Sequence, residues 1–193
     1  MTSRTYYDAS ARMTPANVIT VGRLLLSPLL FVMVLTGGPS YGALALGFVI
    51  AITDSLDGYL ARRMGTTRSG AFLDPLADKV FVLGTLASLV QVGVLPWLPV
   101  VLVAAREFVI SVYRSYWARR SLAIPARNGA KLKTVVQEVA AGLALMPIIG
   151  DERPVVAVVV LWVAVALTLW TGMWYVLDGR KAMSPTGSAG TAG

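Results

Sequence analysis

Four aspartates lie in two short stretches of the chain, DSLDGYLAR and GAFLDPLADK: Asp54, Asp57, Asp74 and Asp78. The members of each pair are three or four residues apart, so a helix would carry each pair on one face. Two like charges 4 Å apart repel by about 4 kcal/mol at an effective dielectric constant of about 20, and bound cations would remove this cost. The spacing therefore predicts a site for one or two divalent cations, which would also bind phosphate oxygens.

The residue types that are absent narrow the choice of metal. The chain contains no cysteine and no histidine, so proton transfer and metal binding must use carboxylates, hydroxyls or amines. Oxygen ligands favour hard cations such as Mg²⁺ or Mn²⁺. Gly58, Ala61 and Gly70 share the acidic faces and would either leave room for a flat group or serve only as packing contacts between helices.

Apolar segments of membrane-spanning length carry the acidic stretches. Hydrophobic residues make up 56% of the 193 residues and charged residues only 14%, a balance typical of membrane proteins. Six segments come close to the roughly 20 residues that cross a bilayer. They are 16–36, 41–60, 71–93, 97–118, 132–149 and 154–177. The predicted fold is all-α and integral to the membrane, with six transmembrane helices; the second and third run antiparallel as neighbours and share an acidic cavity.

The net charge of +7 follows the pattern of a membrane topology. Basic residues lie at both ends of the chain and in every second connection: Arg4, Arg12, Arg62, Arg63, Arg68, Arg119, Arg120, Arg127, Lys131, Lys133, Arg180 and Lys181. The only basic residue in the other connections is Arg153. By the positive-inside rule both termini are cytoplasmic, as are the basic connections. This distribution argues against a nucleic-acid-binding surface, and it attracts anionic membrane lipid instead.

Three parts of the chain are predicted. Residues 1–13 are polar and aromatic and could form a short interfacial segment, residues 14–181 form the six-helix domain, and residues 182–193 form a disordered tail. Asp8 and Arg12 interrupt the pattern of a cleaved signal peptide, so the N-terminus is expected to be a mature cytoplasmic end. Within the first span, Asn17, Thr20 and Arg23 share one helical face, which either snorkels toward the cytoplasm or faces an internal cavity.

The acidic stretches resemble the signature of the CDP-alcohol phosphotransferases, D-x-x-D-G-x-x-A-R followed after a short gap by G-x-x-x-D-x-x-x-D. All eight fixed positions are present: Asp54, Asp57, Gly58, Ala61, Arg62, Gly70, Asp74 and Asp78. The gap from Arg62 to Gly70 is one residue shorter than in bacterial members. The resemblance implies an enzyme with six transmembrane helices, usually a homodimer, which transfers a phosphatidyl group from CDP-diacylglycerol to an alcohol and releases CMP.

The resemblance also implies a role for each signature residue. The metal ligands, for two ions, would be Asp54, Asp57, Asp74 and Asp78, with Asp78 also the preferred general base. The nucleotide-binding residues would be Asp54, Asp57, Gly58, Ala61, Arg62 and Gly70, with the small residues lining the cytidine pocket and the arginine assisting the diphosphate. Arg62 would otherwise be only a topology marker, and Asp78 with Lys79 a simple neutralised pair.

Two further segments resemble the branch of bacterial phosphatidylglycerophosphate synthases. AREFVISVYR and AKLKTVVQ are similar to that branch's R-E-x-x-x-S-x-x-R and G-K-x-K-T-x-x-Q, although Ala130 replaces the usual glycine. The acceptor would then be glycerol 3-phosphate, a small dianion that needs a cradle of cations. The candidates are Arg106, Arg114, Lys131 and Lys133. The alternative is that the lysines only mark topology, while Arg106 pairs with Glu107 or Glu138.

The sequence therefore predicts a multi-pass enzyme of the bacterial plasma membrane with its active site at the cytoplasmic side. It would make phosphatidylglycerophosphate from CDP-diacylglycerol and glycerol 3-phosphate, with Mg²⁺ or Mn²⁺ as cofactor. The nearest alternative keeps this chemistry with inositol phosphate or phosphatidylglycerol as the acceptor. A divalent-cation transporter and a non-catalytic lipid-binding scaffold are alternatives of other classes.

Overall fold

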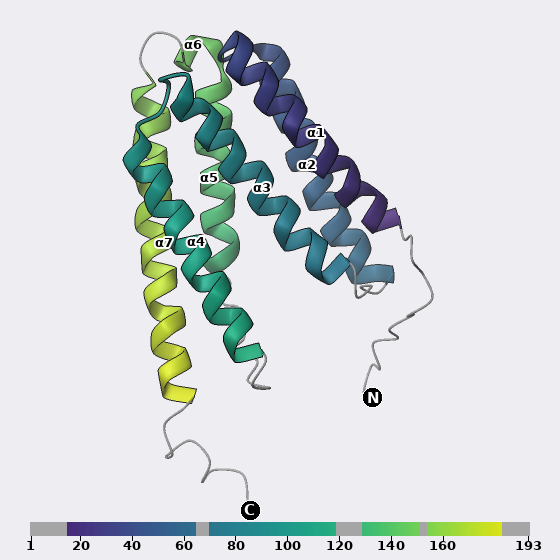
Figure 1. The fold of residues 1–193 in the computed structure, drawn as a ribbon, viewed down its shortest axis with the longest axis vertical. Helices are drawn as coiled ribbons and strands as arrows, with labels where there is room; N and C mark the ends of the chain where they lie inside the picture. The colour runs from purple at the N-terminus through teal and green to yellow at the C-terminus, as the bar shows by residue number, and fades with distance from the viewer. Residues whose placement is uncertain (1–14, 65–69, 119–128, 151–153, 183–193) are drawn as a thin grey trace, which may run out of the picture.

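The computed structural model describes residues 15–64, 70–118, 129–150 and 154–182, and in these ranges every regular element is an α-helix (Figure 1). The helices are α1 (Pro15–Gly37), α2 (Tyr41–Met64), α3 (Gly70–Gln91), α4 (Trp97–Ala118), α5 (Gly129–Leu145), α6 (Pro147–Gly150) and α7 (Val155–Ala182). The all-helical prediction is confirmed. The interfacial segment 1–13 lies outside the described residues. So does the predicted tail 182–193 except for Ala182, with which α7 ends.

Local sequence explains where several helices begin and end. Gly38 follows α1 with φ +67° and Gly93 follows α3 with φ +80°, a conformation that costs glycine little. The Ser40 hydroxyl accepts a hydrogen bond from the Ala43 backbone N–H at 3.1 Å and caps α2. These short reversals return the chain into the bundle after α1 and α3.

The fifth predicted segment, 132–149, is divided in the structure. α5 ends at Leu145 and the single turn α6 starts at Pro147. Proline has no N–H to donate, and its ring disfavours continued helix in the residues before it. A hydropathy average does not detect the break that a proline causes, so the sequence predicted one helix where the structure has two.

The long helices alternate in direction, so their ends gather at the two ends of the bundle (Figure 1). α2 ends and α3 begins at one end, which we call the acidic end; it lies at the bottom of Figure 1. α1, α5, the last residues of α4 and the last residues of α7 also reach this end, whereas α6 lies at the opposite one. The predicted antiparallel course of α2 and α3 is confirmed.

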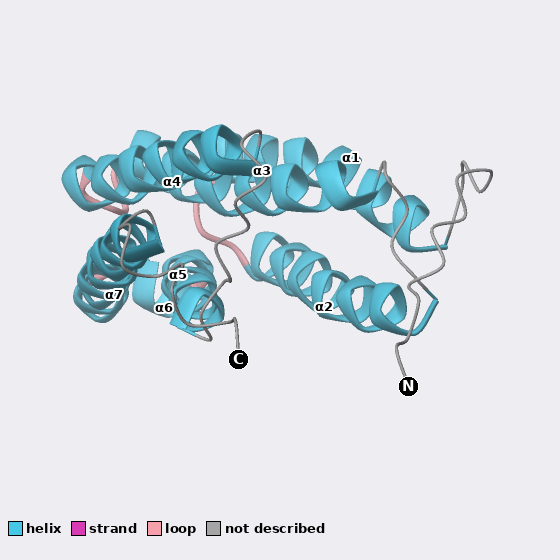
Figure 2. Ribbon diagram, turned by 90° about the horizontal axis from the view of Figure 1, so that it is seen from below, coloured by secondary structure: helices cyan, strands magenta, loops and turns pink. Residues whose placement is uncertain are grey.

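Direct packing of α2 against α3 is not among the close helix contacts of the described residues. Both helices pack on α1 and on α5 instead, while α7 packs on α4 and α5 (Figure 2). α2 and α3 therefore flank a hollow, because a neighbouring helix on either side holds them apart.

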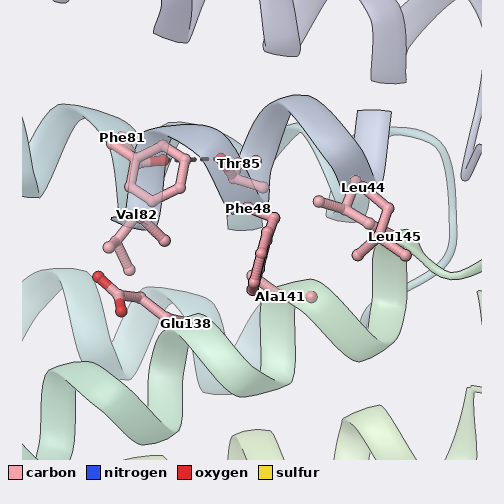
Figure 3. Close-up of a pocket in the computed structure, with 11 residues that line it drawn as sticks. Leu44, Phe48, Phe81, Val82, Thr85, Glu138, Ala141 and Leu145 are labelled. Carbon is pink, nitrogen blue, oxygen red and sulfur yellow. Dashed lines mark hydrogen bonds between the residues drawn. The ribbon is translucent and has the colours of Figure 1, made fainter. Parts of the chain in front are cut away.

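That hollow includes a pocket of about 90 Å³ between α2, α3 and α5 (Figure 3). Its lining is mostly apolar: Leu44, Gly47, Phe48, Ala51, Phe81, Val82, Thr85, Glu138, Ala141, Gly142 and Leu145. Ala51 comes one helical turn before Asp54, and Phe81 one turn after Asp78. The pocket thus begins just beyond the acids, on the side away from the acidic end.

Several polar side chains point inward, and many large apolar ones lie on the outer surface as well as in the core. Arg23 is 1% exposed and Lys133 7%, whereas Leu25 is 73% exposed and Phe108 72%. In water this pattern would be costly, but it suits a molecule surrounded by lipid. By length and composition, two helices in the described ranges could cross a bilayer, through Ile19–Gly37 and Val155–Trp174.

Candidate active site

The four signature aspartates lie in two helices that meet the same end of the bundle. α2 carries Asp54 and Asp57 about three and two turns before its end, and α3 carries Asp74 and Asp78 in its first three turns. Gly58, Ala61, Arg62 and Gly70 lie in the same two helices, and side chains from 54 to 76 are outside the described part of the structure. The structure thus supports the helical spacing on which the acidic site depends.

The residues present fit a hard divalent cation by their chemistry. Among the described side chains no group of three or more acids lies together, and Asp78 is the one signature aspartate whose side chain is described. Its Oδ1 atom is buried. A buried carboxylate oxygen one helical turn from Asp74 belongs to a donor set that Mg²⁺ or Mn²⁺ prefers.

Two of the predicted acceptor-binding cations meet on one carboxylate. Arg106 Nη1 on α4 donates to Glu107 Oε1 at 2.9 Å, and Lys133 Nζ on α5 donates to the same oxygen. The three side chains are only 9–13% exposed. The structure shows the pairing with Glu107 that the alternative interpretation gave Arg106, and Lys133 shares the same carboxylate.

α7 holds the other side of this group. Arg106 Nη2 donates to Thr171 Oγ1 at 3.1 Å, and Gln137 Nε2 on α5 donates to Thr168 Oγ1 at 3.0 Å. A Cβ atom on Gly172 would come within 3.0 Å of Arg106 Nε, so glycine leaves the space that the guanidinium occupies. The hydrogen bonds fix Arg106 and Gln137 in an interior where unpaired donors are costly.

Lys79 reaches the same region from α3. Its ammonium donates to Ser111 Oγ on α4, and this hydroxyl donates to the Glu107 carbonyl oxygen at 2.6 Å. The charges of Lys79 and Arg106 both act on Lys133. We call Lys79, Arg106, Glu107 and Lys133 the cation cluster.

The polar face of α1 turns inward. Thr20 and Ser27 are fully buried and Arg23 is 1% exposed. Snorkelling would leave the guanidinium in water, so the snorkelling interpretation of Arg23 is wrong, and Thr20 and Arg23 face the interior of the bundle. The Asn17 side chain lies outside the described residues.

The remaining predicted acceptor-binding residues, Arg114 and Lys131, are placed only by their helices. Arg114 and Lys131 lie in α4 and α5, but their side chains are outside the described part. Three residues of this group were not predicted from the sequence as site residues: Lys79, Glu107 and Thr171. Thr168 and Thr171, three residues apart in an otherwise apolar span, were a usable signal.

Comparison with known proteins decides the family. The family model described as CDP-alcohol phosphatidyltransferase matches residues 13–170. The chain belongs to the CDP-alcohol phosphatidyltransferase family. This family is integral to the membrane, so the chain is a membrane-bound transferase of phospholipid biosynthesis. The transporter and scaffold alternatives are therefore wrong.

Named relatives of this transferase agree with one another. It is 42% identical over 167 residues to a "Probable phosphatidylglycerophosphate synthase" of Mycobacterium tuberculosis, covering 83% of this chain and 79% of that protein. It is 38% identical over 174 residues to a "CDP-diacylglycerol–glycerol-3-phosphate 3-phosphatidyltransferase" of Shigella flexneri, covering 85% and 93%.

A solved structure shares the fold. The apo crystal structure of Mycobacterium tuberculosis phosphatidylinositol phosphate synthase superimposes with a TM-score of 0.62 at 20% identity, covering 87% of this transferase and 90% of that chain. At this identity the likeness supports the arrangement of helices alone.

Proposed function

We propose that this transferase moves a phosphatidyl group from CDP-diacylglycerol to glycerol 3-phosphate, giving phosphatidylglycerophosphate and CMP. Two relatives at 42% and 38% identity carry names for this reaction. In this chain the proposal is supported by the meeting of Arg106 and Lys133 on the single Glu107 carboxylate beside α3, the helix of Asp78. One carboxylate neutralises only one of these two charges, so the pairing leaves a positive charge for a phosphate.

The donor would bind at the acidic end with its lipid tails in the bilayer. Asp54, Asp57, Asp74 and Asp78 would hold one or two Mg²⁺ or Mn²⁺ ions, which when bound neutralise charge on the diphosphate and on the departing CMP. Arg62 would assist the diphosphate, while Gly58, Ala61 and Gly70 would leave the flat cytosine base room between the helices. The last two assignments rest on the family signature.

The acceptor phosphate would bind at the cation cluster. Arg106 and Lys133 supply charge-assisted donors, with Thr171 holding the guanidinium in place. Arg114 lies eight residues closer to the acidic end on α4, and Lys131 two residues closer on α5, so both would line the route by which a soluble acceptor enters. Position 131 is about 200° around the helix from position 133, which gives Lys131 the more peripheral role.

The chemical step follows from the adjacency of these two sites. The acceptor hydroxyl oxygen attacks the phosphorus that bears the diacylglycerol, the bond from that phosphorus to the CMP oxygen breaks, and CMP leaves with the electron pair. Asp78 takes the hydroxyl proton. The cation cluster fixes the acceptor in line for this attack, an effect of orientation rather than of acid–base chemistry.

The proposal includes six membrane crossings, by α1 to α4, by α5 with α6, and by α7, with the acidic end in the cytoplasm of a bacterial cell. The basic residues beside that end support this orientation. Pairing of two copies as a homodimer rests on the family resemblance alone.

The test is an acceptor panel. Purified protein in lipid nanodiscs receives CDP-diacylglycerol with Mg²⁺ or Mn²⁺ and, in separate reactions, glycerol 3-phosphate, inositol phosphate or phosphatidylglycerol. CMP release and the lipid product are measured. We expect turnover with glycerol 3-phosphate that a chelator abolishes. Turnover only with another acceptor would overturn the acceptor assignment and leave the transferase chemistry intact.

A further inference from the structure

Lys79 has a position that the acidic site does not explain. It follows Asp78 directly, and successive residues on a helix are about 100° apart around the axis. Its ammonium reaches across to α4 and donates to Ser111 Oγ. α3 therefore carries the proposed base and, on an adjacent face, a cation directed at another helix.

The partner of Lys79 is Ser111, which lies on α4 one helical turn after Glu107. Ser111 Oγ donates to the Glu107 carbonyl oxygen one turn earlier, at 2.6 Å. On that turn Glu107 Oε1 accepts from both Arg106 and Lys133. Three cations from α3, α4 and α5 thus surround one turn of α4, and two of them converge on a single oxygen atom.

The charges in this cluster do not balance. Within the cluster, Lys79, Arg106 and Lys133 provide three positive charges and Glu107 provides one negative charge. Asp78, directly before Lys79, is counted with the proposed metal site, whose bound cations would balance its charge. Ser111 offers Lys79 an oxygen but no charge. Glu138, also on α5, lines the apolar pocket toward α2 and α3 and belongs to another face. A net charge of two in a half-buried interior calls for a dianion, since uncompensated charge is costly there.

We propose that Lys79 is a third cation of the acceptor site and that the net double positive charge selects a phosphomonoester dianion over a phosphodiester monoanion. This inference rests on the proposed function and adds to it the rule by which the acceptor is chosen. Glycerol 3-phosphate and inositol phosphate both satisfy the rule, and phosphatidylglycerol does not. Glu107 is then the internal anion that keeps Arg106 and Lys133 together while the site is empty.

Lys79 also connects the proposed donor site with the proposed acceptor site. The acids that hold the donor and the cluster that holds the acceptor meet at consecutive residues of one rigid helix. A phosphate bound by Lys79 therefore has a fixed distance to Asp78, which orients the acceptor hydroxyl. Lysine is suited to this place because its compact ammonium acts as a point charge on a flexible stem.

The experiment compares Lys79→Met with the wild type in two assays. In the first, KM for glycerol 3-phosphate is expected to rise at least about tenfold, the loss typical of one hydrogen bond to a charged group, with KM for CDP-diacylglycerol changed less than about twofold. In the second, inorganic phosphate is expected to raise the melting temperature of the wild type and not that of Lys79→Met. Dimethyl phosphate, a monoanion, should stabilise neither.

Two further variants control for a non-specific loss of folding or activity. Lys181→Met removes a lysine ten residues beyond Thr171, about 15 Å farther along α7, and should leave both assays unchanged. Ser111→Ala removes only the anchoring oxygen and should raise the acceptor KM in the same direction by a smaller factor, which tests the inference even where Lys79→Met does not fold.

Three results would overturn the inference. One is an unchanged acceptor KM in Lys79→Met; the second is a fall in kcat alone, which would assign Lys79 to the neighbouring acids; the third is equal stabilisation by phosphate with and without Lys79. The phosphate assay needs no turnover. If the wild type fails to use glycerol 3-phosphate but still binds phosphate through Lys79, the proposed function fails and the dianion site stands.

Discussion

Gly172 of α7 makes room for the guanidinium that the acceptor site depends on. A Cβ atom there would lie 3.0 Å from Arg106 Nε, closer than an ordinary van der Waals contact, and 3.5 Å from Cγ, an ordinary contact. The neighbouring Thr171 hydroxyl receives Arg106 Nη2 at 3.1 Å. One added methyl group would therefore move the guanidinium away from its partner without removing any charge.

We predict that Gly172→Ala raises the acceptor KM by about twofold to tenfold, a loss comparable to weakening one hydrogen bond. The donor KM should not change, and neither should the amount of folded protein. Steady-state kinetics with glycerol 3-phosphate varied at saturating donor provides the measurement. Gly22→Ala is the matched control, because a Cβ atom at Gly22 would meet no atom within 4 Å; equal effects of the two substitutions would contradict the prediction.

The aspartates give a second prediction at this scale. Asp57→Asn or Asp74→Asn is expected to lower CMP release by about a thousandfold or more, since losing a metal ligand removes several kcal/mol of charge stabilisation. The remaining activity should need a higher Mg²⁺ or Mn²⁺ concentration. Asp151→Asn, in the connection before α7, is the control. Full turnover by either variant would refute the metal assignment.

Several site residues were predictable because they are charges in otherwise apolar helices. Arg106 and Lys133 meet this criterion and lie together in the structure. Lys79 was not predicted as a site residue, because its nearest charge along the chain is Asp78 and a local pair was a sufficient explanation. Which neighbouring helix a side chain reaches is a matter of packing, which spacing along one helix does not contain.

Between elements, the contact of α1 with α3 depends on one small residue. A Cβ atom on Gly84 of α3 would overlap the ring of Phe31 from α1. Leu30 and Val34 of α1 and Leu86 of α3 are fully buried in the same core. The glycine therefore lets an aromatic ring lie against the backbone of α3, and this fixes the two helices at close range.

Gly84→Ala is expected to destabilise the bundle by about 1–3 kcal/mol through overpacking, although alanine is the better helix former. Thermal unfolding in detergent, followed by loss of the monodisperse species, measures the change. Adding Phe31→Leu to Gly84→Ala should restore part of the loss, and the double-mutant cycle gives the coupling. Gly142→Ala, with nothing within 4 Å of its Cβ position, should not destabilise. Lack of coupling between positions 84 and 31 would contradict the packing argument.

The sequence predicted helix bounds well and helix neighbours less well. The predicted first segment, 16–36, agrees closely with α1, which runs from Pro15 to Gly37. The connection between α2 and α3 is short, so direct packing was the natural expectation. In the structure α2 and α3 each pack on α1 and α5 instead. This leaves the pocket between α2, α3 and α5. Sequence proximity fixes which helix ends meet, but the side chains of all neighbours decide how far apart the helix axes lie.

For the whole molecule, the distribution of polarity explains why a hydropathy test selects only two of the long helices in the described residues. Among the described residues only α1 and α7 pass a test of length and composition. α4 and α5 place charges inside the bundle, where Glu107 and Lys133 meet, and large apolar side chains such as Phe108 and Val139 outside. A window average mixes the two faces, so a helix that is apolar only toward lipid scores low.

This arrangement makes the orientation of the molecule testable. Pro96 is exposed between α3 and α4 at the end opposite the acids, and Ala182 closes α7 at the acidic end. The natural chain has no cysteine, so Pro96→Cys and Ala182→Cys each create a single thiol. In intact bacteria a membrane-impermeant maleimide should label Pro96→Cys, and it should label Ala182→Cys only after the membrane is permeabilised.

The acceptor is a charged, water-soluble metabolite, so the acids and the cation cluster must open toward the compartment that supplies it. Labelling of Ala182→Cys in intact cells would put the acidic end outside and would contradict both the orientation and the route proposed for the acceptor.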